Sequence, residues 1–228
     1  FGGMGSDDFA RRLKAIAPDA RILISIRSQM RILTSVYMQY LLRGGTMSPE
    51  LFFAGDPELG FYGFRPEHFE YHRLVKLYQD LFGAENVHVI TQESLKTDMD
   101  GATNRLAEFA GNTSFHGVLP SHRSAYAPSY PEYAVPLLRR INKLQKSVLV
   151  PAPTVRIGTT PDGFYRAFGY LLRRPPFSRL LKGYHPVSEH VEKTFRGRFD
   201  DSNRELAKFV GHYLDLSEYG GGATMPKA

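Results

Sequence analysis

The stretch Arg21-Ile-Leu-Ile-Ser-Ile-Arg27 is the feature that most constrains the fold of this 228-residue chain. Such a short and nearly continuous apolar run is typical of a strand that is buried on both faces of a parallel sheet. Apolar positions at helical spacing then run from Ser28 to about Arg43, and Gly44-Gly45 closes that element. A buried strand that turns directly into a helix predicts an α/β fold.

The same alternation of strand and helix continues along the chain. We expect a first helix that begins at Ser6, buries Phe9, Leu13 and Ile16, and ends at Pro18-Asp19. The residues Val87–Thr91 form a second candidate strand, expected beside the first and parallel to it. Two more helices are expected, over about residues 67–82 and 97–110.

The second half of the chain is expected to be mostly helical. Helices are predicted near residues 133–146, 164–173 and 187–209, after a region in which prolines recur. Residues 46–65 are rich in Gly, Pro and Phe without a clear period, which indicates a long ordered loop or lid. We therefore predict one domain over residues 1–228, with a parallel sheet flanked by helices.

Composition narrows the classes of function. The absence of cysteine excludes disulfides, thiolate catalysis and thiolate metal sites, and no metal is expected. No apolar run approaches the roughly 20 residues of a membrane span, and no signal peptide is recognisable, so we expect a cytoplasmic protein. A net charge of +6 favours anionic partners such as nucleotides, nucleic acid, acidic glycans or anionic lipid.

Arg27 is the first candidate site residue. An Arg at the end of a strand, followed at once by a helix, places a guanidinium beside free backbone N–H groups and so forms an anion site. Ser35 lies eight positions further along, and Arg31 is one helical turn from both. The residue pattern alone favours a surface or salt-bridging Arg27 over an anion-binding one.

The segment from Arg27 to Tyr37 resembles the 3′-phosphate-binding motif of sulfotransferases that use 3′-phosphoadenosine 5′-phosphosulfate (PAPS). The resemblance implies that Arg27 and Ser35 contact the 3′-phosphate of that donor. Gln29 stands where the family often has Pro.

Later segments resemble the same family in the same order. Residues 71–95, which end in Glu93-Ser-Leu95, are similar to its helix, strand and Glu-x-Leu segment, although Gln92 replaces a frequent aromatic residue. Lys182-Gly183 resembles the loop that folds over the donor in bacterial and glycan-type members. A plain helix C-cap is the alternative interpretation of Lys182-Gly183.

The resemblance implies a P-loop-NTPase-like sheet and the transfer of a sulfuryl group from PAPS to an acceptor hydroxyl, with PAP as product. A sugar hydroxyl is the favoured acceptor, and a phenol, a lipid or a small alcohol are alternatives. The first strand and the loop that holds the 5′-phosphosulfate are expected upstream of Phe1, and Arg156-Ile-Gly-Thr-Thr160 is not expected to replace that loop.

The catalytic residues cannot be assigned from the sequence. His68, Glu70 and His72 either face the acceptor or occupy an exposed helix face. The competing function is a non-catalytic sulfotransferase-like or basic module that binds nucleic acid or acidic glycan. The sulfotransferase interpretation requires no nucleic-acid partner.

Overall fold

The computed structural model describes residues 5–55, 63–118, 130–153, 158–210 and 214–219. These residues form two compact units, each built from segments that are distant in the sequence. The sheet unit comprises residues 5–29, 66–118, 197–210 and 214–219, and the helical unit comprises residues 30–55, 63–65, 130–153 and 158–196. The single domain stays a prediction.

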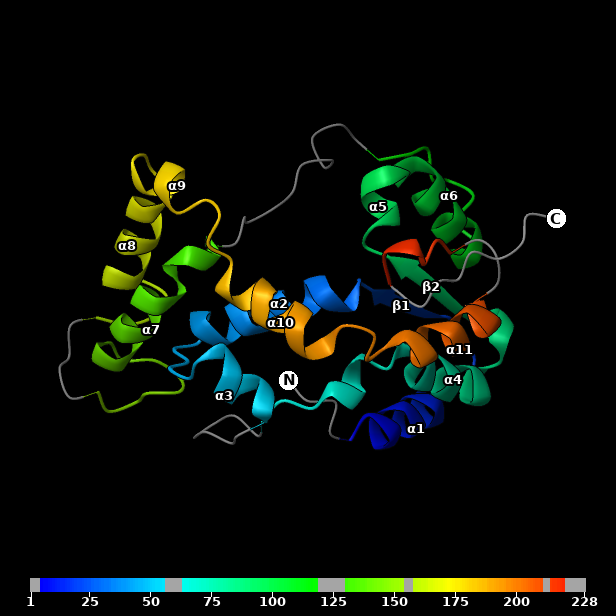
Figure 1. The fold of residues 1–228 in the computed structure, drawn as a ribbon. Coiled ribbons are helices and arrows are strands. Elements are labelled where there is room, and N and C mark those ends of the chain that lie inside the picture. The colour runs from blue at the N-terminus through cyan, green and yellow to red at the C-terminus, as the bar shows by residue number, and fades with distance from the viewer. Residues whose placement is uncertain (1–4, 56–62, 119–129, 154–157, 211–213, 220–228) are drawn as a thin grey trace. The chain divides into compact units, whose positions relative to one another are not determined.

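A pair of parallel strands lies at the centre of the sheet unit (Figure 1). Strand β1 (Ile22–Ile26) pairs with β2 (Val87–Thr91) in a register that sets Ile22 opposite Val87 and Ile26 opposite Thr91. The prediction of two neighbouring parallel strands is therefore confirmed. The α/β class is confirmed with it, and the described residues contain a two-stranded sheet.

Helices surround this strand pair. The sheet unit contains α1 (Ser6–Ile16), α4 (Tyr71–Phe82), α5 (Ser94–Thr97), α6 (Met99–Ala110) and α11 (Asp200–Val210). It also contains the 3₁₀ turns η1 (Pro66–Phe69), η2 (Ala84–Asn86) and η5 (Ser217–Tyr219). Figure 1 shows α5 and α6 on the opposite side of the strands from α4 and α11.

The two faces of the strand pair are covered to different extents. Ile24, Ile26 and Val89 belong to one core with residues of α4 and α11. On the other face the ring of His88 stacks on Phe109 of α6, with ring centroids 5.1 Å apart, whereas Leu23 is 47% exposed. Burial on both faces is confirmed for β2 and is wrong for β1 within the described residues, because α5 and α6 pack on β2.

The first helix differs from the prediction in what it buries. Helix α1 begins after Gly5, no side chain caps it, and Phe9 and Ile16 are exposed. Ala10 is buried and Leu13 packs on the core of the sheet unit, where α1 contacts α4. The buried face of α1 is thus narrower than the face that its apolar residues form in the sequence.

The helical unit contains most of α2 (Gln29–Leu42), together with α3 (Pro49–Ala54), α7 (Val135–Leu144), α8 (Phe164–Leu172), α9 (Phe177–Leu180), α10 (Pro186–Phe195) and the turn η4 (Glu132–Ala134). Helix α2 begins two residues after Arg27, as predicted. The expected lid contains helix α3, which the Ser48 side chain caps, and residues 56–62 of that lid lie outside the described residues.

The last predicted helix is two helices. Helix α10 ends at Phe195 and α11 begins at Asp200, with Gly197 between them at φ +73°. A left-handed glycine interrupts helical hydrogen bonding, which explains the break.

Buried amides hold the helical unit together. Asn142 of α7 donates from Nδ2 to the carbonyl oxygens of Leu41 (2.9 Å) and Gly45 (2.8 Å). Its Oδ1 accepts from the Thr160 hydroxyl (3.0 Å). One fully buried side chain thus joins the end of α2, α7 and the segment that precedes α8.

We predict that Asn142→Ala lowers the free energy of unfolding by about 1.5–3 kcal/mol, because buried carbonyl groups lose their donor. The exposed neighbour Lys143 provides the control, and Lys143→Ala should change stability by less than about 0.5 kcal/mol. Urea unfolding of both variants measures the difference. If both variants changed the free energy of unfolding equally, the Asn142 hydrogen bonds would not stabilise the helical unit.

Candidate functional site

Arg27 lies in the short turn between β1 and α2, at the carboxyl end of β1. Arg27 is half-buried, and its backbone carbonyl accepts a hydrogen bond from the Tyr71 hydroxyl (2.8 Å). The next residue, Ser28, donates its backbone N–H to Glu93 Oε1 (3.2 Å) and its hydroxyl to the carbonyl of Glu218 (3.2 Å). The turn is therefore fixed by contacts from three other segments of the sheet unit.

Glu93 is the charged member of this group, and it is only 8% exposed. Its Oε2 accepts a hydrogen bond from the Tyr219 hydroxyl (3.0 Å), so both carboxylate oxygens have a donor. Burial, with the neighbouring Glu93 carboxylate, raises the pKa of Tyr219, and burial raises the pKa of Tyr71. Both phenols consequently remain protonated donors at neutral pH.

Gln29 makes a second set of contacts. Its Nε2 donates to Asn203 Oδ1 (2.7 Å) and to the carbonyl of Phe69 (3.2 Å), and Asn203 Nδ2 donates to the carbonyl of Tyr219 (2.6 Å). Proline has no side-chain amide. Gln29 therefore has a structural role that a proline at this position could not fill.

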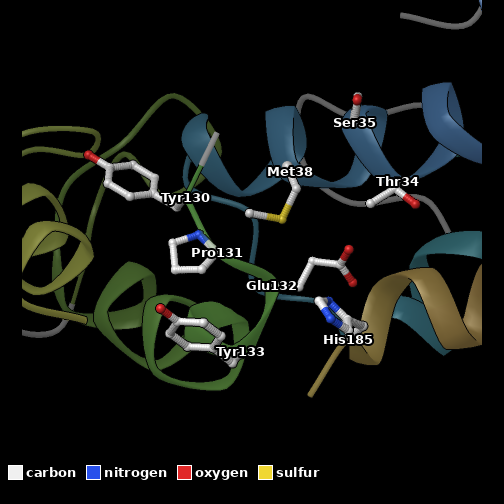
Figure 2. A pocket seen from close by; sticks show the side chains of 8 residues that line it. All are labelled: Thr34, Ser35, Met38, Tyr130, Pro131, Glu132, Tyr133 and His185. Atoms are coloured by element: carbon white, nitrogen blue, oxygen red, sulfur yellow. The ribbon is translucent and has the colours of Figure 1, made fainter. Parts of the chain in front are cut away.

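Ser35 lies on α2 and lines a pocket of about 240 Å³ in the helical unit (Figure 2). Its hydroxyl donates to the carbonyl of Arg31 (3.0 Å). The pocket is lined by Thr34, Ser35, Met38, Tyr130, Pro131, Glu132, Tyr133 and His185. Two phenol rings, two aliphatic hydroxyls and an imidazole therefore border one hollow.

Glu132 supplies the carboxylate of the pocket, and both of its oxygens are engaged. Oε2 accepts from the backbone N–H groups of Val187 (3.1 Å) and Ser188 (2.8 Å), and Oε1 accepts from the Ser188 hydroxyl. These donors belong to the first turn of α10, where the helix dipole favours a negative charge. Glu132 thus caps α10 and joins it to η4.

Lys182 and Gly183 form an exposed turn between α9 and α10. A Cβ on Gly183 would meet no atom within 4 Å, and its φ is not in the left-handed region. The turn therefore lacks the left-handed glycine of the common helix cap. His185, two residues further along, lines the Ser35 pocket.

The predicted site residues thus fall in two places. Ser35 and the segment that follows Lys182-Gly183 meet at one pocket of the helical unit. Arg27 belongs to the sheet unit. A joint 3′-phosphate site of Arg27 and Ser35 stays a prediction.

The other candidates have structural contacts. The Glu70 carboxylate pairs with Arg73 (2.6 Å) and Arg198 (3.7 Å), and His72 Nδ1 is 2.8 Å from the Ser202 hydroxyl of α11. Burial lowers the pKa of His68. In the segment Arg156–Thr160, residues 156 and 157 lie outside the described residues, and Thr160 bonds to Asn142.

Sequence reasoning missed the structural role of Glu93 and the pocket residues Tyr130, Glu132, Tyr133 and His185. Glu93 stood out as part of a Glu-x-Leu segment, but its partner Ser28 is 65 positions away. Periodicity reports local structure alone, so it carries no signal for such pairs.

No family model, curated protein or solved structure matches the chain. Across the described ranges, no group of three or more His, Cys, Asp or Glu side chains is arranged to hold a metal ion. The same ranges contain no helix of the length and apolarity needed to cross a membrane.

We predict that Glu93→Gln lowers the free energy of unfolding by about 1.5–3 kcal/mol. A glutamine side chain has one acceptor oxygen, so its NH₂ group would face either the Ser28 N–H or the Tyr219 hydroxyl. The exposed Glu108 of α6 is the matched control, and Glu108→Gln should have little effect. Urea unfolding gives both values, and an unchanged Glu93→Gln protein would contradict the role of this carboxylate.

Proposed function

We propose that the chain acts as a PAPS-dependent sulfotransferase. The observation that carries the proposal is the position of Arg27, at the carboxyl end of a parallel strand and two residues before a 14-residue helix. Ligands of open parallel α/β sheets bind at the carboxyl ends of the strands. An Arg in the turn that leads into a helix suits a phosphate dianion, because a guanidinium and the N-terminus of a helix both favour a negative charge. The proposal includes a P-loop-NTPase-like sheet, of which β1 and β2 are two strands.

The donor's 3′-phosphate is assigned to Arg27 and Ser35, with Lys182 and Gly183 as further donor-binding residues. Arg27 contributes a charge-assisted contact worth about 1.5–3 kcal/mol. Ser35 contributes less, because its hydroxyl already donates to the carbonyl of Arg31 and must exchange that bond for one to the phosphate. Arg27 is therefore expected to contribute more to the free energy of donor binding than Ser35 does.

The pocket beside Ser35 is assigned to the acceptor. Both oxygens of the Glu132 carboxylate already accept hydrogen bonds from α10, so this side chain is held in place at the pocket. The rings of Tyr130 and Tyr133, with nearby hydroxyl groups, suit a neutral molecule that carries hydroxyls, such as a sugar. Sulfuryl transfer needs an aligned hydroxyl and a base for its proton, and His185 supplies an imidazole at this pocket.

A non-catalytic basic module is the competing function, because the chain is cationic overall. Binding to nucleic acid or to an acidic glycan would fall steeply with salt and would need no adenosine nucleotide. A specific donor site would instead distinguish nucleotides by their 3′-phosphate.

We predict that adenosine 3′,5′-bisphosphate raises the melting temperature more than 5′-AMP does at equal concentration. At about 100 times Kd a ligand adds about 2.7 kcal/mol of stability. For a chain of this size that corresponds to roughly 5–10 °C. Equal shifts with both nucleotides would count against the donor site.

We predict that Arg27→Ala weakens binding of adenosine 3′,5′-bisphosphate by about 10- to 150-fold, and that Ser35→Ala weakens it by less than about tenfold. Ser35→Ala should leave the melting temperature unchanged or slightly higher, because alanine is the better helix former. Arg21, at the other end of β1, is the control, and Arg21→Ala should retain the affinity. Calorimetry measures all three affinities.

A stable Arg27→Ala protein with undiminished affinity would refute the assignment. If Arg27 is instead a structural salt-bridging residue, its replacement lowers the melting temperature and leaves nucleotide affinity unchanged.

A further inference from the structure

Exposed apolar side chains concentrate in one part of the helical unit. Six of the twelve large apolar side chains that are exposed in the described residues fall between positions 164 and 184, on α8, on α9 and in the turn that follows. They are Phe164, Tyr170, Leu171, Phe177, Leu180 and Tyr184. Single exposed apolar residues are normal, but a cluster of this kind marks an interaction surface.

The same part of the chain is strongly basic. Residues 163–188 contain five Arg and Lys side chains and no Asp or Glu. Arg174, Arg179 and Lys182 form no ion pair with any residue in the described ranges, while Arg166 pairs with Asp162 (3.5 Å). The apolar cluster is therefore accompanied by positive charge that is not neutralised locally.

Cationic and aromatic groups alternate along α8 and its C-cap residue Arg173. The Arg173 guanidinium lies over the rings of Tyr130 (4.9 Å) and Tyr170 (5.6 Å), and Arg166 lies over Tyr170 (5.7 Å). Tyr165, Phe168 and Leu172 pack into the core of the unit, whereas Phe164, Tyr170 and Leu171 of α8 are exposed. Side chains at a membrane interface likewise combine apolar or aromatic groups with charged ends.

We propose that residues 164–184, which we term the basic aromatic surface, bind an anionic lipid bilayer without spanning it. Aromatic and leucine side chains enter the boundary between headgroups and acyl chains, and Arg and Lys contact the lipid phosphates. Nucleic acid or an acidic glycan would attract the positive charge but would offer no apolar region in which Leu171 and Leu180 could be buried. A second copy would bring five like charges against five. The proposal does not depend on sulfuryl transfer.

Cosedimentation of the chain with lipid vesicles tests the proposal. One set contains phosphatidylcholine alone, and the other contains phosphatidylcholine with roughly 30% phosphatidylglycerol. We expect at least about tenfold tighter binding to the anionic vesicles, weakened by salt because the Debye length shortens. Equal binding to both sets, or binding to neither, would overturn the proposal.

Two pairs of variants separate the apolar from the charged contribution. Leu180→Ser is matched by Val148→Ser, since Leu180 and Val148 are both 78% exposed. Arg179→Glu is matched by Lys193→Glu on α10, and both positions are exposed. We expect Leu180→Ser to weaken binding to anionic vesicles about five- to tenfold and Arg179→Glu about tenfold or more, with both controls near the parent value.

Two results would assign the surface to another partner. Binding to heparin or single-stranded DNA that exceeds vesicle binding and is unaffected by Leu180→Ser would identify a polyanion site and overturn the proposal. A dimer in sedimentation velocity that Leu180→Ser dissociates would identify a contact between copies and would also overturn it.

Discussion

The buried carboxylate of Glu93 is the interaction on which the geometry of the candidate anion site depends. A buried charge is costly unless hydrogen-bond donors surround it, and here the donors are the Ser28 N–H and the Tyr219 hydroxyl. These two donors come from the turn after β1 and from η5, while Glu93 itself follows β2. One carboxylate therefore joins three segments. The hydrogen bond between the Gln29 and Asn203 side chains also joins the start of α2 to α11. The backbone that carries Arg27 is fixed before any ligand arrives.

The sequence predicted those elements whose signal is local. The apolar run of β1, its abrupt change to helical spacing and the second run of β2 are each decided by neighbouring residues, and the structure confirms them. It did not predict that Leu23, Phe9 and Ile16 would be exposed, because an apolar pattern says which face can be buried but not what covers it. The break at Gly197 was missed because helical periodicity continues on both sides of it.

The candidate site was predictable only in part, and for the same reason. Arg27 and Ser35 share a short segment, so their chemistry can be read from spacing and from a family resemblance. The pocket beside Ser35 depends on Glu132, whose partner Ser188 is 56 positions away. Asn142 likewise reaches Gly45 across 97 positions. Such contacts are chosen by packing, and a single sequence does not record them.

Tyr130 connects the pocket beside Ser35 with the basic aromatic surface. It lines the pocket beside Ser35, and its ring also lies under the Arg173 guanidinium. His185 of the pocket directly follows Tyr184 of that surface. If the surface rests on a bilayer, the pocket lies close to that bilayer, because Tyr130 and His185 adjoin both. The two proposals together then favour an acceptor whose hydroxyl is carried by a lipid, such as a glycolipid headgroup, over a sugar that diffuses freely, because anchoring both partners to one surface raises their effective concentration.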